Sequence, residues 1–202
     1  MRGPIVIACG TILMLSGGLL QAQEAASKPE ARWAEVAVSD DTLEGRYRVP
    51  TSFGGQPHSE FSYAVFLSEN RDFVGSAGLL MGTELNFGWE PLQIKFGPQA
   101  YAAMLNEENN DVFLLAVGVE ARYELVPSRA IAIRAHGYYA PDILTFGAAD
   151  EMTDVMVRGE MELTDRLIIF AGYRWFRLEL NNTEQRDLQN QLFGGVRWQV
   201  RQ

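Results

Sequence analysis

One histidine in this sequence stands where it could do acid–base chemistry. His136 follows Arg134 by two positions, which places both side chains on one face of an extended strand. A histidine acts as a general base when a carboxylate or hydroxyl orients it within hydrogen-bond distance. The carboxylates on neighbouring segments are Asp154, Glu120 and Glu160. The sequence therefore leaves two interpretations: a hydrolase built on His136, or a hydrogen-bonded histidine without catalytic role.

Metal and cofactor chemistry find no support in the residue types. The chain has two histidines and one cysteine, and they form no cluster with metal-ligand spacing. We expect neither a metal nor a cofactor. The 26 acidic residues outnumber the 17 basic ones. Because phosphate binding needs clustered lysine and arginine, we do not expect nucleic acid as a partner.

A larger set of charged residues shares the polar parity of alternating segments. Only Lys28 and Lys95 are lysines, so nearly all basic residues are arginines. Guanidinium groups pair with carboxylates in a forked geometry and are weakly hydrated, which favours an enclosed lumen over a soluble surface. The predicted lumen-lining residues are Glu44, Arg46, Arg48, Glu60, Glu84, Lys95, Glu120, Arg122, Arg134, His136, Asp154, Arg158, Glu160, Arg174 and Arg197.

The segments that carry these residues alternate between polar and apolar positions. In residues 92–96, for example, Leu92, Ile94 and Phe96 flank Gln93 and Lys95. This period of two indicates β-strands with one polar and one apolar face. Ten such segments are predicted, at residues 32–38, 42–49, 59–69, 73–85, 92–104, 111–125, 129–140, 151–163, 167–180 and 191–201.

The ninth predicted strand changes parity along its length. Tyr173 and Trp175 fit one parity, whereas Leu178 and Leu180 fit the other. We therefore expect a β-bulge near Phe176.

Two architectures accommodate ten alternating strands. A soluble sandwich or barrel buries its apolar face, whereas a transmembrane barrel turns it to lipid and keeps polar residues inside. The segments are long enough for tilted membrane-spanning strands, which need roughly 9–11 residues. Apolar-parity aromatics also gather near strand ends, as expected for two membrane girdles. These residues are Tyr47, Phe61, Tyr123 and Trp198 at one end, and Phe73, Phe113, Tyr139 and Trp175 at the other.

These features favour an all-β, antiparallel, transmembrane up-and-down barrel of ten strands, with eight strands as the alternative. A buried apolar core is not required in such a barrel, because the apolar parity faces lipid. Short turns at residues 126–128 and 164–166 are expected on the periplasmic side, and long loops at residues 141–150 and 181–190 outside. Both chain ends then lie in the periplasm.

The first 22 residues have the layout of a secretory signal peptide. Met1-Arg2 gives a positive start, an apolar stretch follows, and Ala22 supplies a small residue for cleavage. The alternative, a membrane anchor, is disfavoured because the stretch is shorter than the roughly 20 residues of a spanning helix. We expect a signal peptide at residues 1–22, a flexible polar leader at 23–31 and the barrel at 32–202. No later apolar run of 18 residues exists, which excludes a helical membrane protein.

Several stretches carry a family resemblance. Residues 138–146 read Tyr-Tyr-Ala-Pro-Asp-Ile-Leu-Thr-Phe, residues 171–174 read Ala-Gly-Tyr-Arg, and residues 194–198 read Gly-Gly-Val-Arg-Trp. With Ser-Asp-Asp-Thr at residues 39–42, the chain resembles the YfaZ family of small Gram-negative outer-membrane proteins over residues 34–200. The resemblance implies an outer-membrane, porin-like barrel, and the family supplies no settled substrate or catalytic residues to carry over. One departure is the C-terminal Gln202, where such barrels commonly end in an aromatic residue.

The sequence leaves the role of the lumen open. The charged parity could line a narrow channel that selects a small solute, or form an ion-pair network that fills the barrel. We expect a non-enzymatic protein of the Gram-negative outer membrane, with lipid and the barrel-assembly machinery as partners. The hydrolase based on His136 and a periplasmic β-sandwich are the alternatives.

Overall fold

The computed structural model describes residues 31–52, 59–86, 91–106, 110–126, 130–180 and 185–200. The predicted signal peptide and all but the last residue of the predicted leader lie outside these ranges. No helix in the described ranges is long and apolar enough to cross a membrane.

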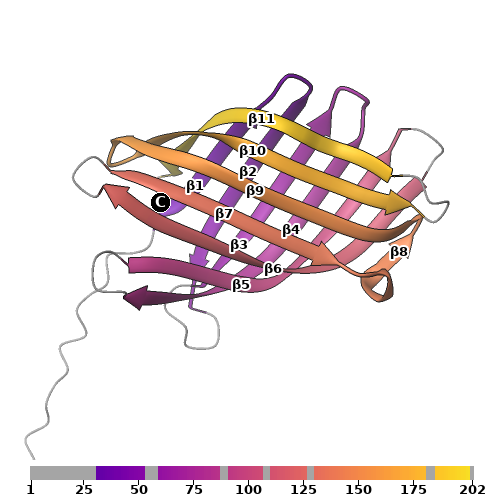
Figure 1. Ribbon diagram of the computed structural model, residues 1–202, viewed down its shortest axis with the longest axis horizontal. Helices are drawn as coiled ribbons and strands as arrows, with labels where there is room; N and C mark the ends of the chain where they lie inside the picture. The colour runs from indigo at the N-terminus through magenta and orange to yellow at the C-terminus, as the bar shows by residue number, and fades with distance from the viewer. Residues whose placement is uncertain are drawn as a thin grey trace, which may run out of the picture. The chain divides into compact units, whose positions relative to one another are not determined.

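Ten β-strands form the wall of the barrel (Figure 1). They are β1 (Arg32–Val38), β2 (Thr42–Thr51), β3 (Ser59–Ser68), β4 (Phe73–Asn86), β5 (Pro91–Leu105), β6 (Asn110–Val126), β7 (Ile131–Ala140), β9 (Ala149–Thr164), β10 (Leu167–Leu180) and β11 (Gln185–Val200). A short strand, β8 (Thr145–Gly147), and a 3-10 helix, η3 (Asp142–Leu144), lie between β7 and β9. The predicted all-β barrel of ten strands is confirmed, and the eight-strand alternative is wrong.

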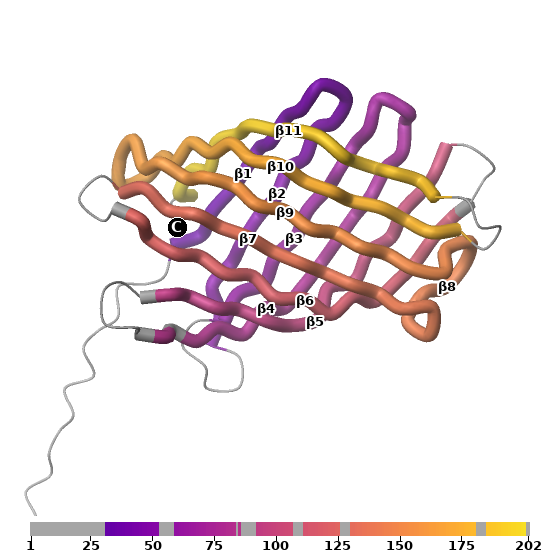
Figure 2. Tube along the Cα trace, viewed as in Figure 1, coloured from indigo at the N-terminus to yellow at the C-terminus, as the bar shows by residue number. Residues whose placement is uncertain are grey.

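Each barrel strand pairs antiparallel with its two neighbours, and the ring closes between β1 and β11. This seam runs from Arg32 opposite Val200 to Val38 opposite Gly194. Figure 2 shows β7, β9, β10 and β11 crossing the near wall, with β1 to β4 behind them at a steep angle. We call the end of the barrel that holds Arg32 and Val200 the terminal end, and the other the opposite end. Strand closure gives every barrel strand a partner on both sides, which removes the main cause of edge-to-edge aggregation.

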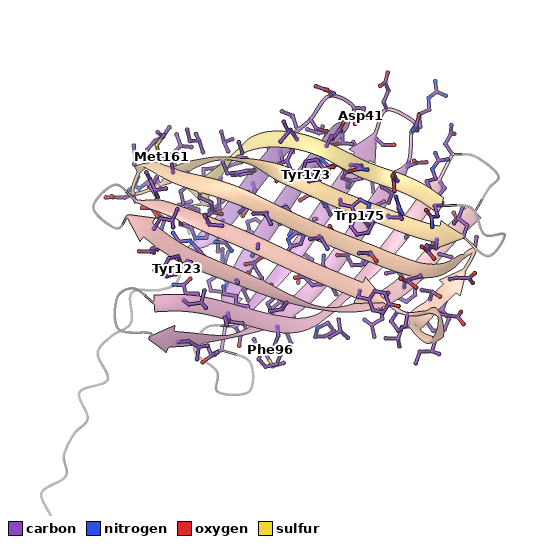
Figure 3. All side chains as sticks on the ribbon, in the orientation of Figure 1. Asp41, Phe96, Tyr123, Met161, Tyr173 and Trp175 are labelled. Carbon is purple, nitrogen blue, oxygen red and sulfur yellow. The ribbon has the colours of Figure 1, made fainter. Side chains whose placement is uncertain are left out.

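The outer face of the wall is apolar. Every barrel strand carries at least one large hydrophobic side chain that is exposed, among them Val38, Val65, Phe96, Val117 and Val157. Figure 3 shows Phe96 and Tyr123 on the outside, with Tyr123 toward one end and Trp175 toward the other. The inward positions alternate with these along each strand, because successive side chains point to opposite faces.

The predicted bulge near Phe176 is present, although its cause differs from the prediction. The register of β10 against β11 shifts between Phe176 and Arg177. The extra residue is Leu188 on β11, and both Leu188 and Gln189 are buried. On β10 itself the inward positions continue without interruption through Leu178 and Leu180. The apparent change of parity arises because these two inward positions are apolar.

The connections at the opposite end also differ from the prediction. The loop predicted for residues 181–190 is shorter, because β11 already begins at Gln185. The loop predicted for residues 141–150 contains η3 and β8. β8 pairs with the start of β6, where Phe113 stands opposite Phe146, and so covers the part of β6 that β7 does not reach. Gly147 has a φ of +99°, and a Cβ there would lie 2.3 Å from the Asp111 carbonyl oxygen, so only glycine fits.

An apolar core fills part of the lumen, contrary to the expectation that none was required. The buried residues of this apolar half are Phe66, Val74, Leu80, Tyr101, Ala103, Leu105, Val112, Leu114, Ala116, Tyr138, Ala140, Ala149, Met152, Phe176, Leu178, Leu180 and Leu188. Phe176 packs against Phe66 and Tyr101, each with ring centroids 5.9 Å apart. Most of these residues belong to the parts of their strands nearest the opposite end. The rest of the lumen is occupied by charged side chains.

Candidate functional site

The charged lumen is the candidate site, because it brings nearly all the predicted residues together. Arg46, Arg48, Glu120, Arg134, His136, Asp154, Arg158, Glu160, Arg174 and Arg197 are buried inside the barrel. Glu44, Glu60, Lys95 and Arg122 are also inside but partly exposed. The side chain of Glu84 lies outside the described part of the structure. Their hydrogen bonds and ion pairs divide these residues into two clusters.

Glu120 anchors the first cluster, which we call the arginine–glutamate cluster. Its two carboxylate oxygens accept hydrogen bonds from Nη1 and Nη2 of Arg48, at 3.0 and 2.8 Å. Arg134 also donates to Glu120 through Nη1. Arg48 reaches a further carboxylate, since its Nη1 lies 2.5 Å from Oε1 of Glu60, which in turn accepts from Lys95 at 2.7 Å. These residues come from β2, β3, β5, β6 and β7, so the cluster spans the lumen.

Glu160 on β9 is the second centre of this cluster. Its Oε1 accepts from Nε of Arg134 at 2.8 Å and from Nε of Arg158 at 2.9 Å. Its Oε2 accepts from Arg122 and Arg197, each at 3.3 Å. Four guanidinium groups therefore share one carboxylate. Moving such ions out of water costs several kcal/mol each, which only full pairing offsets.

Glu35 on β1 completes the cluster, and the sequence analysis missed it. Nη1 and Nη2 of Arg158 donate to its two carboxylate oxygens at 2.8 and 3.3 Å. Arg48 and Arg197 approach the same carboxylate at 3.4 and 3.8 Å. β1 is only seven residues long, and Trp33, Glu35 and Ala37 share its inward face. Applying the parity rule to this short strand would have placed Glu35 inside.

The second cluster, which we call the Asp154 cluster, adjoins the apolar half. Arg174 holds Asp154 with two parallel hydrogen bonds from Nε and Nη2, both 2.8 Å long, and donates to Glu44 through Nη1. Glu44 also accepts from Arg46 at 2.8 and 3.0 Å. The Arg174 guanidinium stands over the Phe176 ring at 4.7 Å from its centroid. Arg174 therefore contacts both kinds of lumen filling.

His136 belongs to the Asp154 cluster. Its Nε2 lies 3.3 Å from Oδ1 of Asp154, while the hydroxyl of Tyr101 donates to Oδ2 at the same distance. Asp154 does orient the imidazole, as a catalytic pair would require. Only 1% of the His136 side chain is exposed. A substrate therefore has no access to it in this conformation. The described residues include no group of three His, Cys, Asp or Glu side chains placed to hold a metal ion.

Burial of the charged side chains decides whether the lumen is open. Arg48, Glu120, Arg158 and Glu160 have side-chain exposures of 1–4%. A water-filled pore would leave the side chains that line it exposed, so water does not pass these residues freely. Exposure increases toward the terminal end, where Lys95 reaches 20% and Glu124 34%. The lumen is thus wet at its terminal end and sealed further in.

Most of the predicted girdle residues lie on the outer face near strand ends. Phe73, Phe113, Tyr123, Tyr139 and Trp198 are exposed, and Tyr47, Phe61 and Trp175 are half-buried. Beyond Trp175 the outer face of β10 becomes polar, since Arg177 pairs with Asp187 at 2.6 Å and stacks over the Trp175 ring. The change from apolar to polar at Trp175 marks one boundary of the apolar belt.

Comparison with known protein families identifies the chain. The family model described as YfaZ precursor matches residues 67–199. The chain belongs to the YfaZ family. The match begins near the end of β3 and runs almost to the end of β11, so it includes both centres of the arginine–glutamate cluster, Glu120 and Glu160.

No curated protein matches the chain. Among solved structures, the outer membrane channel DcaP of Acinetobacter baumannii matches with 12% sequence identity and a TM-score of 0.38. The match covers 82% of this chain and 54% of that channel, so the chain spans about half the channel's length.

Residues 138–146, the longest stretch that carries the family resemblance, link the lumen to the outer face of the YfaZ-family barrel. They comprise the end of β7, η3 and the start of β8. Tyr138 points inward and packs edge-on against Tyr101, with ring centroids 6.5 Å apart. Phe146 is exposed on the outside, 6.2 Å from the ring of Phe113. The proline at 141 ends β7, because proline has no N–H group for the strand ladder.

Proposed function

We propose that this YfaZ-family chain is a non-enzymatic β-barrel protein of the Gram-negative outer membrane, and that its lumen is closed at rest. The observation that carries the proposal is the inversion of polarity across the wall. Charged side chains are paired and buried inside, while large hydrophobic side chains are exposed outside on every strand. A soluble barrel has the reverse arrangement, because exposed apolar surface on this scale causes association in water. Lipid is the solvent that suits this outer face.

The aromatic residues support the same location. They flank the apolar belt, as expected where rings sit at the two membrane interfaces. The terminal end is the periplasmic end in this proposal, because the two-residue turn between β9 and β10 lies there and the longer β7–β9 connection lies opposite. A chain exported by a signal peptide would be inserted by the barrel-assembly machinery, with the aromatic Trp198 near the end of the last strand.

The closed lumen argues for a structural membrane protein rather than a constitutive porin. Ten strands lie near the limit at which side chains fill a barrel, whereas open aqueous channels are typical of about 16–18 strands. Both interior halves follow that expectation, since the charged half is sealed by ion pairs and the apolar half by packed side chains. Any small solute would need the lumen to rearrange.

The hydrolase hypothesis is disfavoured by the position of His136. A catalytic histidine has to meet its substrate within hydrogen-bond distance. His136 is buried beside Asp154 and Arg174, and the cavity of about 20 Å³ that it borders is too small for a substrate. The pair of His136 and Asp154 is best interpreted as part of the lumen filling.

Two measurements test the proposal. The purified protein should need detergent for solubility and should migrate differently on a gel before and after boiling, because closed barrels resist unfolding by detergent. Full solubility without detergent, together with no mobility shift, would overturn the membrane location. In a planar lipid bilayer the protein should give no steady conductance. A large constitutive current would contradict the closed lumen.

A further inference from the structure

We propose that water and small ions reach the charged lumen from the opposite end by a path beside the apolar half, and that the Glu35–Arg158 ion pair closes this path. The inference rests on the proposed membrane function and assigns its access route and its gate. Four observations carry it: a polar cavity, a gap in the strand ladder, the position of the apolar half, and the thinness of the seal.

A cavity of about 20 Å³ lies where the two charged clusters meet. Glu35 and Arg158 of the arginine–glutamate cluster line one side, and Glu44, Arg46, His136 and Arg174 of the Asp154 cluster line the other. A buried water needs roughly 10–15 Å³ and two to four polar partners, so this space is large enough for one. Nδ1 of His136 is buried and has no hydrogen-bond partner among the described residues. A water in the cavity would supply the missing partner.

Part of the cavity's lining lies beside a gap in the strand ladder near the opposite end. Its remaining lining includes Val38 and Thr42, which flank the β1–β2 turn, and Gln189 and Phe193 on β11. The β1–β11 ladder ends at Val38 opposite Gly194, so β11 runs on past the turn without β1 as a partner. Side chains bridge this gap in place of backbone hydrogen bonds. Gln191 donates to the hydroxyl of Ser39 at 2.6 Å and to the carboxylate of Asp41.

The apolar half does not block this route. None of its residues lines the cavity. Water that passes the β1–β2 turn therefore meets Thr42 and Gln189, which are polar, before it reaches the ion pairs of Glu44 with Arg46 and Arg174. Glu44 is 14% exposed, more than its partners Arg46 and Arg174, which fits a wet position along this path.

The seal at the inner end of the path is two side chains thick. Glu35, with its partner Arg158, lines the cavity and touches Arg48 at 3.4 Å on the other side. Arg48 in turn contacts Glu60, whose side chain is 12% exposed at the wet terminal end. Removing Glu35 and Arg158 together takes away one charge of each sign and leaves Arg48 as the one remaining layer between the cavity and the wet region. Small ions could then cross the barrel.

The conductance of two variants in planar lipid bilayers tests the gate. The double variant E35A/R158A should show discrete channel events and at least tenfold more current than the parent protein. Leu178→Ala, which removes volume from the apolar half instead, should remain closed. A folded E35A/R158A barrel that does not conduct, or a Leu178→Ala barrel that does, would overturn the proposal. The heat-dependent gel shift reports separately on the membrane fold, so its loss and the loss of conductance are distinguishable.

Cysteine labelling tests the access path even where the double variant does not fold. The chain's one cysteine, Cys9, lies in the predicted signal peptide, which makes single substitutions clean probes. Ala37 lines the cavity, and Ala116 is fully buried in the apolar half. A small water-soluble methanethiosulfonate reagent should modify Ala37→Cys at least tenfold faster than Ala116→Cys. Equal protection of both cysteines in the folded barrel would contradict the path.

Discussion

Along β6 and β10 the inward side chains change chemistry from one end of the barrel to the other. On β6 they run from Leu114 and Ala116, in the apolar half, to Glu120 and Arg122 in the arginine–glutamate cluster. On β10 the change occurs between Arg174 and Phe176. The same backbone therefore presents two kinds of lumen filling, and they differ in what holds them in place.

The two halves differ in how specific their contacts are. Packing in the apolar half depends on volume and shape, and similar side chains substitute at modest cost. In the charged half Glu35, Glu44, Glu120 and Glu160 each contact two or more guanidinium groups, so the loss of one partner leaves others buried without compensation. We expect the charged half to be the more sensitive to single substitutions.

The largest effect should come from Glu160→Ala. This change leaves four guanidinium groups, those of Arg122, Arg134, Arg158 and Arg197, without their shared carboxylate. The free energy of unfolding should fall by about 4 kcal/mol, as for other buried ion pairs that lose one partner. Urea unfolding of the protein refolded in detergent measures it. A loss below about 1 kcal/mol would show that the cluster relaxes around the missing charge.

Replacing a large side chain by a small one in the apolar half should lower the free energy of unfolding somewhat less. Leu114→Ala removes a side chain that is only 1% exposed. Lost burial and the remaining cavity together should lower the free energy of unfolding by about 3 kcal/mol. The same urea titration applies, with exposed Leu192→Ala as the matched control, since Leu192 is 75% exposed. If Leu114→Ala and Leu192→Ala lower the free energy of unfolding by the same amount, the apolar half is not tightly packed.

Conservative substitutions should separate the halves most clearly. Arg158→Lys keeps the charge but loses the paired hydrogen bonds to Glu35 and the second contact to Glu160, at an expected cost of about 2 kcal/mol. Met152→Leu in the apolar half keeps volume and should cost below about 1.5 kcal/mol. The temperature at which half of each variant changes its mobility on a gel ranks the stability of the two variants. Equal midpoints would mean that the charged half is no more specific than the apolar half.

The sequence predicted the wall of the barrel better than its filling. Where neighbouring positions differ strongly in polarity, as Lys95 and Phe96 do, the alternation shows which side chains face the lumen and which face outward. The ten strands and most of the inward charges could therefore be predicted from parity. Parity carries no information where both faces are apolar, as at Leu114 and Leu115 on β6. It misleads at Leu178 and Leu180, where the inward positions are apolar and the outward Arg177 and Glu179 are polar. The apolar half was missed for that reason. Glu35 was missed because a seven-residue strand offers few alternations.

The partnerships inside the lumen were beyond sequence reasoning. Arg158 and Glu35 lie on β9 and β1, with two strands between them around the ring. Their contact depends on barrel closure and on the stagger of the strands, neither of which the alternation of residues specifies. The grouping of the charges into two clusters, with a cavity between them, follows from the same geometry.

The seam between β1 and β11 sets the order of events as the chain folds. Arg32 and Val200, the first and last residues of the barrel strands, are partners, so the ring waits for the C-terminal strand to be delivered. Joining residues so distant in the chain carries a loop-closure cost and slows folding. Until β11 is in place, β1 and β10 both present unpaired edges, which attract other chains. Glu35 on β1 also remains without Arg197 on β11 during this interval. The final strand therefore completes the wall and the charge pairing of the lumen in one step.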